Sequence, residues 1–183
     1  MDAYLVNLVG PFASTIGASF GTFTTKQDVS AKPSPIIPPN VLWEGRRVKI
    51  EAEGDYSSTG TPTIVLGFYV GLPGASGAPA AITTTLAESG ALATSTATSF
   101  PWRMEYRGLI TTSGTSGVIV GSGNAELGTL TALTATAIPI TAALRTVTID
   151  TTLARAVGVC ATWSASSASN TVRVYNMTVQ LMN

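Results

Sequence analysis

The chain has 183 residues, with ten basic and ten acidic side chains, a formal net charge of zero and a hydrophobic content of 45%. This length is enough for one domain with its own core, and the hydrophobic content argues against disorder. A neutral chain has no long-range field to attract DNA, RNA or an anionic membrane, so we expect neither nucleic acid nor a membrane among its partners.

The side chains on which many enzymes depend are scarce. The sequence has no histidine and a single cysteine, Cys160. This excludes Ser-His-Asp and Cys-His arrangements, histidine-ligated metals and an internal disulfide. We therefore expect a protein that is not an enzyme and that has no cofactor or metal.

Neither a signal peptide nor a membrane span is expected. Asp2 stands where a secretory signal would carry a basic residue, which predicts synthesis in a cytoplasm without export. The uncharged stretch Leu127–Leu144 is rich in threonine and is interrupted by Gly128 and Pro139, so it does not fit a transmembrane helix.

Residues 1–40 are predicted to form an extended N-terminal arm outside the domain. A short strand is possible at Ala3–Val9, and the four prolines of Lys32–Asn40 (KPSPIIPPN) remove backbone donors and favour an extended path. Such an arm is either mobile or lies on a neighbouring subunit. The second alternative would bury its large apolar side chains, Phe12, Phe20, Phe23, Ile36 and Ile37.

The stretch Val41–Tyr56 (VLWEGRRVKIEAEGDY) carries seven of the twenty formal charges. Within it, Val48, Ile50 and Ala52 alternate with charged residues, as in a strand that buries one face and exposes the other. This pattern predicts that the sandwich domain, residues 41–183, begins with a strand whose outer face is charged.

Two carboxylates of this strand, Glu51 and Glu53, have a spacing that would suit acid/base chemistry in a cleft. They stand beside Arg47 and Lys49 on the same predicted face. A solvated or interfacial charged surface is therefore the better interpretation.

The middle of the chain predicts further strands. Thr63–Leu72 is apolar on both faces, which is typical of a central strand whose outer face is partly covered. Ala81–Ser99 predicts either a pair of short strands or a surface excursion. Phe100–Leu127 predicts a hairpin, with one face formed by Trp102, Met104, Tyr106 and Ile110 and the other by Arg103, Glu105 and Arg107.

The C-terminal part predicts three more strands, Leu144–Ile149, Ala156–Trp163 and Thr171–Met182. In the last strand the apolar residues change phase, which predicts either a β-bulge near Val174–Asn176 or a strand whose two halves serve different interfaces. Gly121–Gly128 (GSGNAELG) contains G-x-G, but no helix follows to bind a phosphate, so we expect a loop there. Cys160 is expected to be a buried, unreactive thiol.

Together these patterns predict about eight to ten strands and no long helix. The expected fold is an all-β, antiparallel two-sheet sandwich, jelly-roll-like in the first place and immunoglobulin-like in the second. The lone Cys160 argues against an antibody-type sandwich, which needs a second cysteine.

Charge is concentrated on two predicted strands of a chain that is otherwise poor in charge. We therefore expect some of these side chains, among Arg46, Arg47, Arg103 and Arg107, to pair across a subunit interface. Ordinary solvent-facing strands are the alternative. Reversing Arg103 and Arg107 together to Glu would then weaken assembly.

Three segments carry a resemblance to a known class of protein. They are GRRVKIEAEGDYSSTGTPTIVLGFYVG (Gly45–Gly71), FPWRMEYRGLITTSGTSGVIVGSG (Phe100–Gly123) and IDTT…VGVCATWSASSASNTV (Ile149–Val172). In their succession of turns and strands they resemble small virion proteins of tailed bacteriophages. The resemblance implies a jelly-roll subunit, often trimeric, that sits on the capsid as a decoration or cement protein. It supplies no catalytic residues.

From this resemblance we expect a homotrimer on the outer capsid surface of the virion, bound to the major capsid protein, with residues 1–39 clamping a neighbour. Deleting residues 1–39 would leave a folded domain that no longer binds capsids. A head-fibre, tail or receptor-binding virion protein is the alternative, with Trp43, Tyr56 or Tyr69 stacking on sugar. A glycan hydrolase using Glu51, Glu53, Glu105 or Asp150 comes third.

Overall fold

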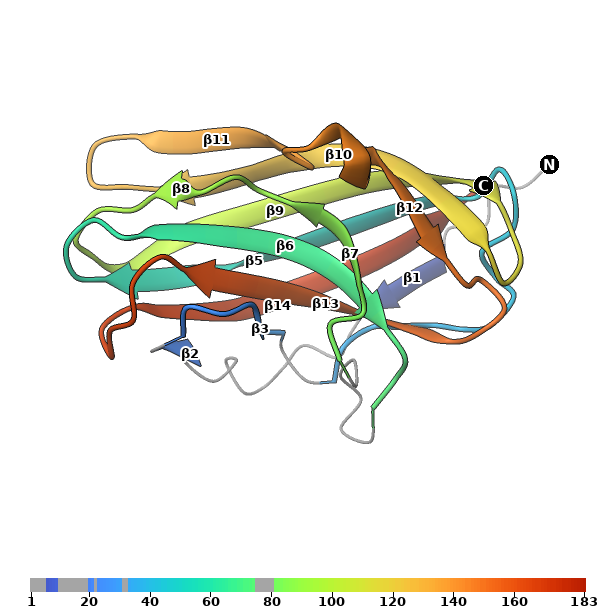
Figure 1. Cartoon of the computed structure of the whole chain (residues 1–183), viewed down its shortest axis with the longest axis horizontal. Helices are drawn as coiled ribbons and strands as arrows, with labels where there is room; N and C mark the ends of the chain where they lie inside the picture. The colour runs from blue at the N-terminus through green and yellow to red at the C-terminus, as the bar shows by residue number, and fades with distance from the viewer. Residues whose placement is uncertain (1–5, 10–19, 22, 31–32, 75–80) are drawn as a thin grey trace.

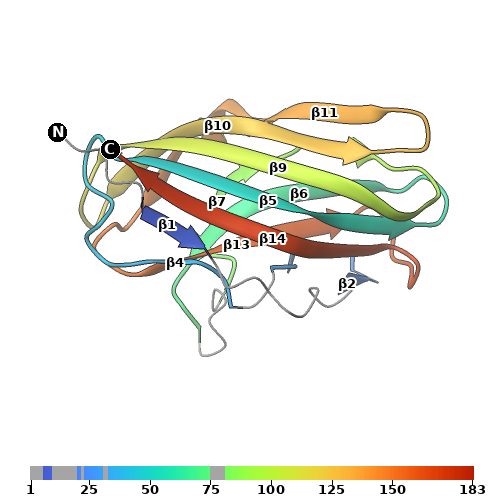
Figure 2. The ribbon, with the colours of Figure 1, turned by 180° about the vertical axis from the view of Figure 1, so that it is seen from behind.

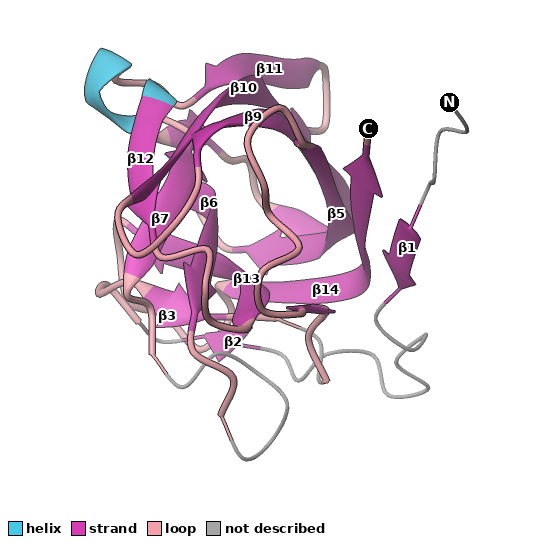
Figure 3. Ribbon diagram, turned by 90° about the vertical axis from the view of Figure 1, so that its right-hand side faces the viewer, coloured by secondary structure: helices cyan, strands magenta, loops and turns pink. Residues whose placement is uncertain are grey.

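The structure, a computed structural model, describes residues 6–9, 20–21, 23–30, 33–74 and 81–183, without the side chains of 6–9, 20–21 and 144. It is an all-β sandwich of two antiparallel sheets and is jelly-roll-like, as the sequence predicted (Figure 1). Seen from the end, the larger sheet curves around the core and the smaller sheet lies opposite (Figure 3). No helix among the described residues is long and apolar enough to cross a membrane.

The larger sheet has the strand order β1-β14-β5-β9-β10-β11, with β2 beside β14 and β12 beside β10. Its strands are β1 (Val6–Val9), β2 (Phe20–Gly21), β5 (Arg47–Ser58), β9 (Ala97–Thr112), β10 (Gly117–Gly128), β11 (Leu133–Ile138), β12 (Thr146–Ile149) and β14 (Thr171–Met182). A short 3-10 helix, Ala142–Arg145, precedes β12.

The smaller sheet has the order β3-β13-β6-β7, with β4 beside β13 and β8 beside β6. Its strands are β3 (Gln27–Asp28), β4 (Ile36–Ile37), β6 (Thr63–Gly71), β7 (Thr84–Glu88), β8 (Leu92–Ala93) and β13 (Arg155–Trp163). The pair of short strands predicted within Ala81–Ser99 is therefore confirmed as β7 and β8, and the predicted hairpin within Phe100–Leu127 as β9 and β10.

The core lies between the sheets and is formed by the inward residues that period-two alternation predicted. Val48, Ile50 and Ala52 of β5 are at most 2% exposed, and Met104 and Tyr106 of β9 are fully buried. Burying a large apolar side chain stabilises the fold by roughly 1.5–3 kcal/mol. This alternation therefore fixes which face of each strand meets the opposite sheet.

The smaller sheet is covered on its outer side as well, which confirms the prediction for Thr63–Leu72. Tyr69 points away from the core and is nevertheless fully buried. The segment that follows β3 contributes to the cover. A Cβ at Gly158 would lie 2.6 Å from Tyr69 Cε1 and 2.8 Å from Ser30 Oγ, and the Ser30 hydroxyl accepts a hydrogen bond from Val159 N (2.8 Å).

The described part of residues 1–40 is not a separate arm, so the predicted domain boundary at Asn40 is wrong for these residues. β1 and β2 pair with β14, whereas β3 and β4 pair with β13. Val29 and Ile37 are buried in the core. Prolines are tolerated beside edge strands because the missing N–H is not needed there, so the Pro-rich stretch still adds β4 to the smaller sheet.

The prediction of a loop at Gly121–Gly128 is wrong. This segment is the C-terminal part of β10, and its residues up to Leu127 pair one by one with β9. Gly121 and Gly123 are required because atoms of the neighbouring strand β9 approach their backbone closely. A Cβ at Gly121 would lie 2.3 Å from Tyr106 Oη, and one at Gly123 would lie 1.8 Å from Glu105 O. A glycine-rich segment can therefore be a central strand where neighbouring atoms fill the space of the side chain.

Candidate functional site

The outer face of the larger sheet is the surface on which the predicted charges gather. Figure 2 shows this side, with β14, β5, β9 and β10 lying next to one another. The outward residues of these strands form rows across the sheet because cross-strand partners lie side by side. Two grooves on this face, one at each end, are the candidate sites.

An ion-pair network occupies the middle of the face. Lys49 Nζ lies 3.0 Å from Glu51 Oε1 and 3.6 Å from Glu105 Oε2. Arg103 Nη2 lies 3.4 Å from Glu51 Oε1, and Arg107 Nε lies 2.5 Å from Glu105 Oε1. These charges, which we expected to pair across a subunit interface, therefore have partners within the same chain.

The network holds Glu105 in the ionised form. Burial alone would raise the pKa of Glu105, but the hydrogen bond from Arg107 and the charge of Lys49 together lower it. A carboxylate with a lowered pKa is a poor general acid at neutral pH. The Asp150 carboxylate is engaged by its own turn, because it accepts hydrogen bonds from Thr152 N (2.9 Å) and Thr152 Oγ1 (2.6 Å).

At one end of the face the predicted bulge presents Tyr175. The register between β14 and β5 shifts between Val174 and Asn176, which confirms the bulge and leaves Tyr175 as the extra residue. Tyr175 is 42% exposed, and its hydroxyl donates to Asp55 Oδ2 (2.6 Å). A bulge can thus re-aim a side chain that a regular strand would direct elsewhere.

Asp55 anchors this arrangement. It is 4% exposed and accepts hydrogen bonds from Arg173 Nε (2.7 Å) and Arg173 Nη2. Burial would raise the pKa of Asp55, but the hydrogen bonds from Arg173 and Tyr175 and the charge of Arg173 lower it below its ordinary value. The same hydrogen bond to Asp55 raises the pKa of the Tyr175 hydroxyl. The guanidinium carbon of Arg173 lies 5.7 Å from the centre of the Tyr175 ring.

Trp102 stabilises the backbone beneath the bulge. Its Nε1–H donates to both Asp55 O and Arg173 O, at 3.1 Å each, so one indole binds the carbonyl groups of two strands. Gly54 leaves the space for this: a Cβ there would lie 1.8 Å from Arg173 O and 2.9 Å from Trp102 Cζ2.

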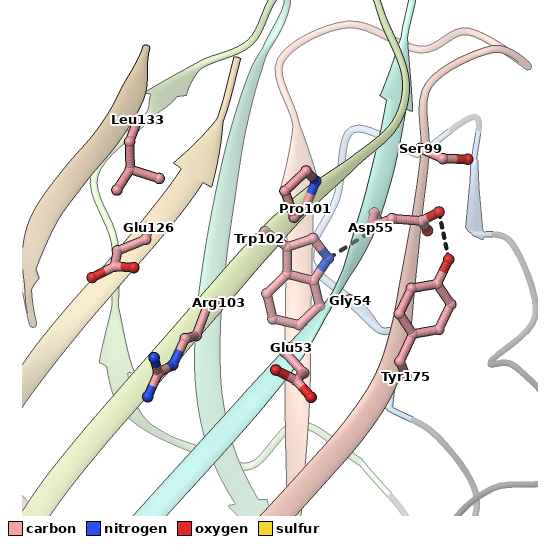
Figure 4. A pocket seen from close by; sticks show the side chains of 10 residues that line it. All are labelled: Glu53, Gly54, Asp55, Ser99, Pro101, Trp102, Arg103, Glu126, Leu133 and Tyr175. Atoms are coloured by element: carbon pink, nitrogen blue, oxygen red, sulfur yellow. Dashed lines mark hydrogen bonds between the residues drawn. The ribbon is translucent and has the colours of Figure 1, made fainter. Parts of the chain in front are cut away.

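The first groove, which we call the Tyr175 groove, is centred on these residues and has a volume of about 490 Å³ (Figure 4). Tyr175 and Asp55 lie on one side of it, and Arg103, Glu126 and Leu133 lie on the other. Leu133 is 65% exposed. The groove therefore combines two exposed apolar side chains with charged groups from β5, β9 and β10.

The second groove lies at the other end of the face, has a volume of about 640 Å³ and is called here the basic groove. Of the described residues that line it, none is acidic and four are cationic: Arg47, Lys49, Arg107 and Arg145. Arg47 and Arg145 are exposed and form no ion pair with other described residues. Such a surface suits an anionic partner.

The four arginines predicted to lie at a subunit interface are found at three different places in the structure. Arg47 and Arg107 line the basic groove, whereas Arg103 lines the Tyr175 groove. Arg46 is a correction: it is 4% exposed, donates to Val41 O (2.8 Å) and Asn183 Oδ1 (3.0 Å), and is therefore not a surface charge.

The predicted apolar interface residues lie mostly within the domain. Phe23 packs against the core, Ile37 is 3% exposed and Ile36 is 39% exposed. Phe20 pairs through its backbone with Val172, and its side chain lies outside the described part. Phe12 lies outside the described residues altogether.

The aromatic residues suggested for sugar stacking are also corrected. Tyr56 and Tyr69 are fully buried, Tyr56 in the core between the sheets and Tyr69 on the covered outer side of the smaller sheet. Trp43 is 46% exposed, and the guanidinium carbon of Arg46 lies 3.5 Å from the centre of its ring. The exposed aromatic residue that the sequence analysis missed is Tyr175, although the change of phase at the bulge marked its position.

Within the described ranges, no group of three or more acidic or cysteine side chains could hold a metal ion. No protein-family model matches the sequence, and no curated protein matches it. Among solved structures, the chain is similar to winged bean acidic lectin in complex with methyl-α-D-galactose, with 9% identity over 100% of both chains and a TM-score of 0.38. A likeness of this degree says nothing about the ligand of this chain.

Proposed function

We propose that this chain is a non-enzymatic structural protein of a tailed-bacteriophage virion, which binds the outer capsid surface as a decoration or cement protein and assembles as a trimer. The resemblance of three segments to such proteins supports this proposal. The head-fibre or tail position is the alternative, and it would use the same fold.

The basic groove is the observation that carries the proposal. It gathers four of the ten cationic side chains of a neutral protein on one open sheet face. Complementary charge steers association and fixes the orientation of partners. An acidic patch on the major capsid protein is the partner that this surface fits.

A structural role is also supported by the state of the carboxylates. Glu51 and Glu105 are each bound by two cationic side chains of the same sheet, and Asp55 by Arg173. Side chains held in this way stabilise a surface and are poorly suited to proton transfer.

The sharpest test reverses Arg47 and Arg145, the two cations of the basic groove that form no ion pair with the described residues. We expect the double variant Arg47→Glu/Arg145→Glu to fold normally but to bind particles lacking this protein at least roughly tenfold more weakly, with the difference decreasing at high salt. Lys26→Glu, at the residue before β3, is the charge-reversal control: it breaks the ion pair with Glu88 but lies outside the groove, and it should bind normally. Co-sedimentation with particles measures the binding, and unchanged binding of the double variant would refute the use of this groove.

The position of the protein on the virion and its oligomeric state need separate measurements. Labelled protein should cover the head uniformly, whereas label confined to one vertex or the tail would favour the alternative. Sedimentation equilibrium should give three times the chain mass. The Arg103/Arg107 reversal is a weaker test of the interface, because it also breaks ion pairs with Glu51 and Glu105.

A further inference from the structure

We propose that the Tyr175 groove is a binding site for a neutral glycan. This site is distinct from the basic groove and goes beyond the structural role proposed above. Four features of the groove support a glycan as its ligand: the exposed ring, the row of polar side chains beside it, the charge of the groove and the rigidity of its supports.

The ring of Tyr175 has the properties of a stacking platform. It is 42% exposed although its hydroxyl is fixed by Asp55 Oδ2 at 2.6 Å. The Arg173 guanidinium lies near one side of the ring, 5.7 Å from its centre. The C–H groups of a sugar pack against an aromatic face in the same way as other apolar groups, and the ring loses little entropy because it is already held.

A row of hydrogen-bonding side chains crosses four strands beside this ring. Asn176 of β14 lies opposite Glu53 of β5 in the sheet register. Glu53 in turn lies opposite Arg103 of β9, and Arg103 lies opposite Glu126 of β10. At a strand spacing of about 4.8 Å, the row extends over about 14 Å. It therefore offers carboxylate acceptors, amide groups and guanidinium donors over more than one sugar ring.

Glu53 and Glu126 are free to accept hydrogen bonds from hydroxyl groups. Among the described residues neither forms an ion pair; Glu53 accepts one long hydrogen bond from Asn176 (3.4 Å) and Glu126 one from Asn124 (2.9 Å). An ionised carboxylate has room for about four such bonds. Unused acceptor capacity beside an exposed ring matches a ligand rich in hydroxyl groups.

The charge and the backbone disfavour other ligands. The charge of Asp55 is compensated by Arg173, but Glu53 and Glu126 outnumber Arg103 in the lining of the groove, so phosphate, nucleic acid and acidic sugars would be repelled. The floor belongs to β5 and β9, whose backbone groups are already paired with neighbouring strands on both sides, so a peptide cannot bind there by strand addition. A neutral glycan needs only side-chain contacts.

The supports of the groove are rigid before a ligand arrives. Asp55 is buried, and Trp102 at the floor is 2% exposed and bound to two carbonyl groups. A site whose side chains are held in place gives up less conformational entropy on binding. The groove is thus preorganised at one end and accessible at the other.

The test is a titration of the full chain with neutral tetrasaccharides of glucose, galactose, mannose and N-acetylglucosamine, with tetragalacturonate as the acidic comparison. Binding is followed in nuclear magnetic resonance spectra by the indole N–H signal of Trp102, which lies in the groove. We expect at least one neutral tetrasaccharide to shift this signal and tetragalacturonate to leave it unchanged. Absence of a shift with all four neutral probes overturns the proposal, and binding of the acidic probe alone overturns the assignment of a neutral ligand.

Substitutions in the Tyr175 groove test whether the glycan binds there. Tyr175→Ala should weaken it roughly tenfold, whereas Tyr175→Phe, which keeps the ring, should retain most of it. Glu126→Gln, which does not touch the buried Asp55 pair, should weaken it several-fold and serves if Tyr175→Ala fails to fold. The matched control is Trp43→Ala, an exposed aromatic residue outside the groove, which should leave binding unchanged.

The outcomes for the two grooves are separable. Tyr175→Ala should bind particles as the original chain does, whereas Arg47→Glu/Arg145→Glu should keep its glycan binding. Normal glycan binding by a folded Tyr175→Ala, or loss of glycan binding in Trp43→Ala, would contradict the proposed site.

Discussion

At the scale of single residues, Asp55 shows how one side chain organises a surface. It lies on β5, but its hydrogen-bond partners Arg173 and Tyr175 lie on β14. Because it is buried and ionised, it must be paired to be tolerated. Its pairing in turn fixes the orientation of the exposed Tyr175 ring.

We predict that Asp55→Asn lowers the free energy of unfolding by about 1–3 kcal/mol at neutral pH, because the hydrogen bonds of Arg173 and Tyr175 lose their charged acceptor. The folded-state pKa of Asp55 lies below its ordinary value of 3.8. Its contribution is therefore complete above that pH and is lost as the pH falls through the folded-state pKa.

Urea unfolding of both proteins over a pH series measures this effect. The difference between them should shrink as the pH falls below about 3.8. Glu53→Gln, two residues away and exposed, is the control and should change stability by less than about 0.5 kcal/mol. A difference that is constant at all pH values would contradict the assigned role of the Asp55 charge.

At the scale of elements, β4 is the segment whose place the sequence pattern predicted wrongly. Ile36 and Ile37 stand between prolines, and nothing in their local pattern distinguishes a pendant arm from an edge strand. The structure pairs them with Ala156 and Arg155 of β13 and buries Ile37 in the core.

Two neighbouring substitutions test this placement. We predict that Ile37→Ala costs about 2–4 kcal/mol of stability because it leaves a cavity in the core. Ile36→Ala, at a side chain that is 39% exposed, should cost about 0.5 kcal/mol. Chemical denaturation of the two variants gives both values, and equal small losses would show that β4 is not part of the folded domain.

The same placement changes the expected result of removing the N-terminal residues. Deletion of residues 1–39 takes away β3, β4 and the buried side chains of Val29 and Ile37. The truncated chain should therefore lose stability as well as any binding, so point substitutions are the better probe.

At the scale of the whole molecule, the two sheets differ in how their outer faces are covered. On the outer face of β6 and β13, Tyr69 and Cys160 are buried and Ser30 lies beside Tyr69, whereas the outer face of the larger sheet carries both grooves. Cys160 of β13 illustrates the covered side: it is 1% exposed, and burial raises the pKa of its thiol to about 12.

We predict that Cys160 is inert towards a thiol-specific disulfide reagent in the native protein at mildly alkaline pH. Because the thiol lies in the middle of a covered sheet, it should react only through global unfolding. Its labelling rate should rise with denaturant in parallel with the unfolded fraction. Ser113→Cys, at an exposed turn, is the control and should react at once. Fast labelling of Cys160 without denaturant would mean that the cover opens locally.

The sequence by itself determined most of the long strands, their inward faces and the position of the bulge, since these follow from the two-residue repeat of an extended backbone and from turn-forming residues. It did not find β4 or the glycine-rich end of β10. Only the tertiary structure decided which distant residues meet. Tyr175 and Asp55 are 120 positions apart, and their contact depends on the order and register of the strands. Local periodicity has no information about cross-strand partners. The residues that cover the smaller sheet, the ion pairs within one chain and the two grooves therefore emerged only from the folded molecule.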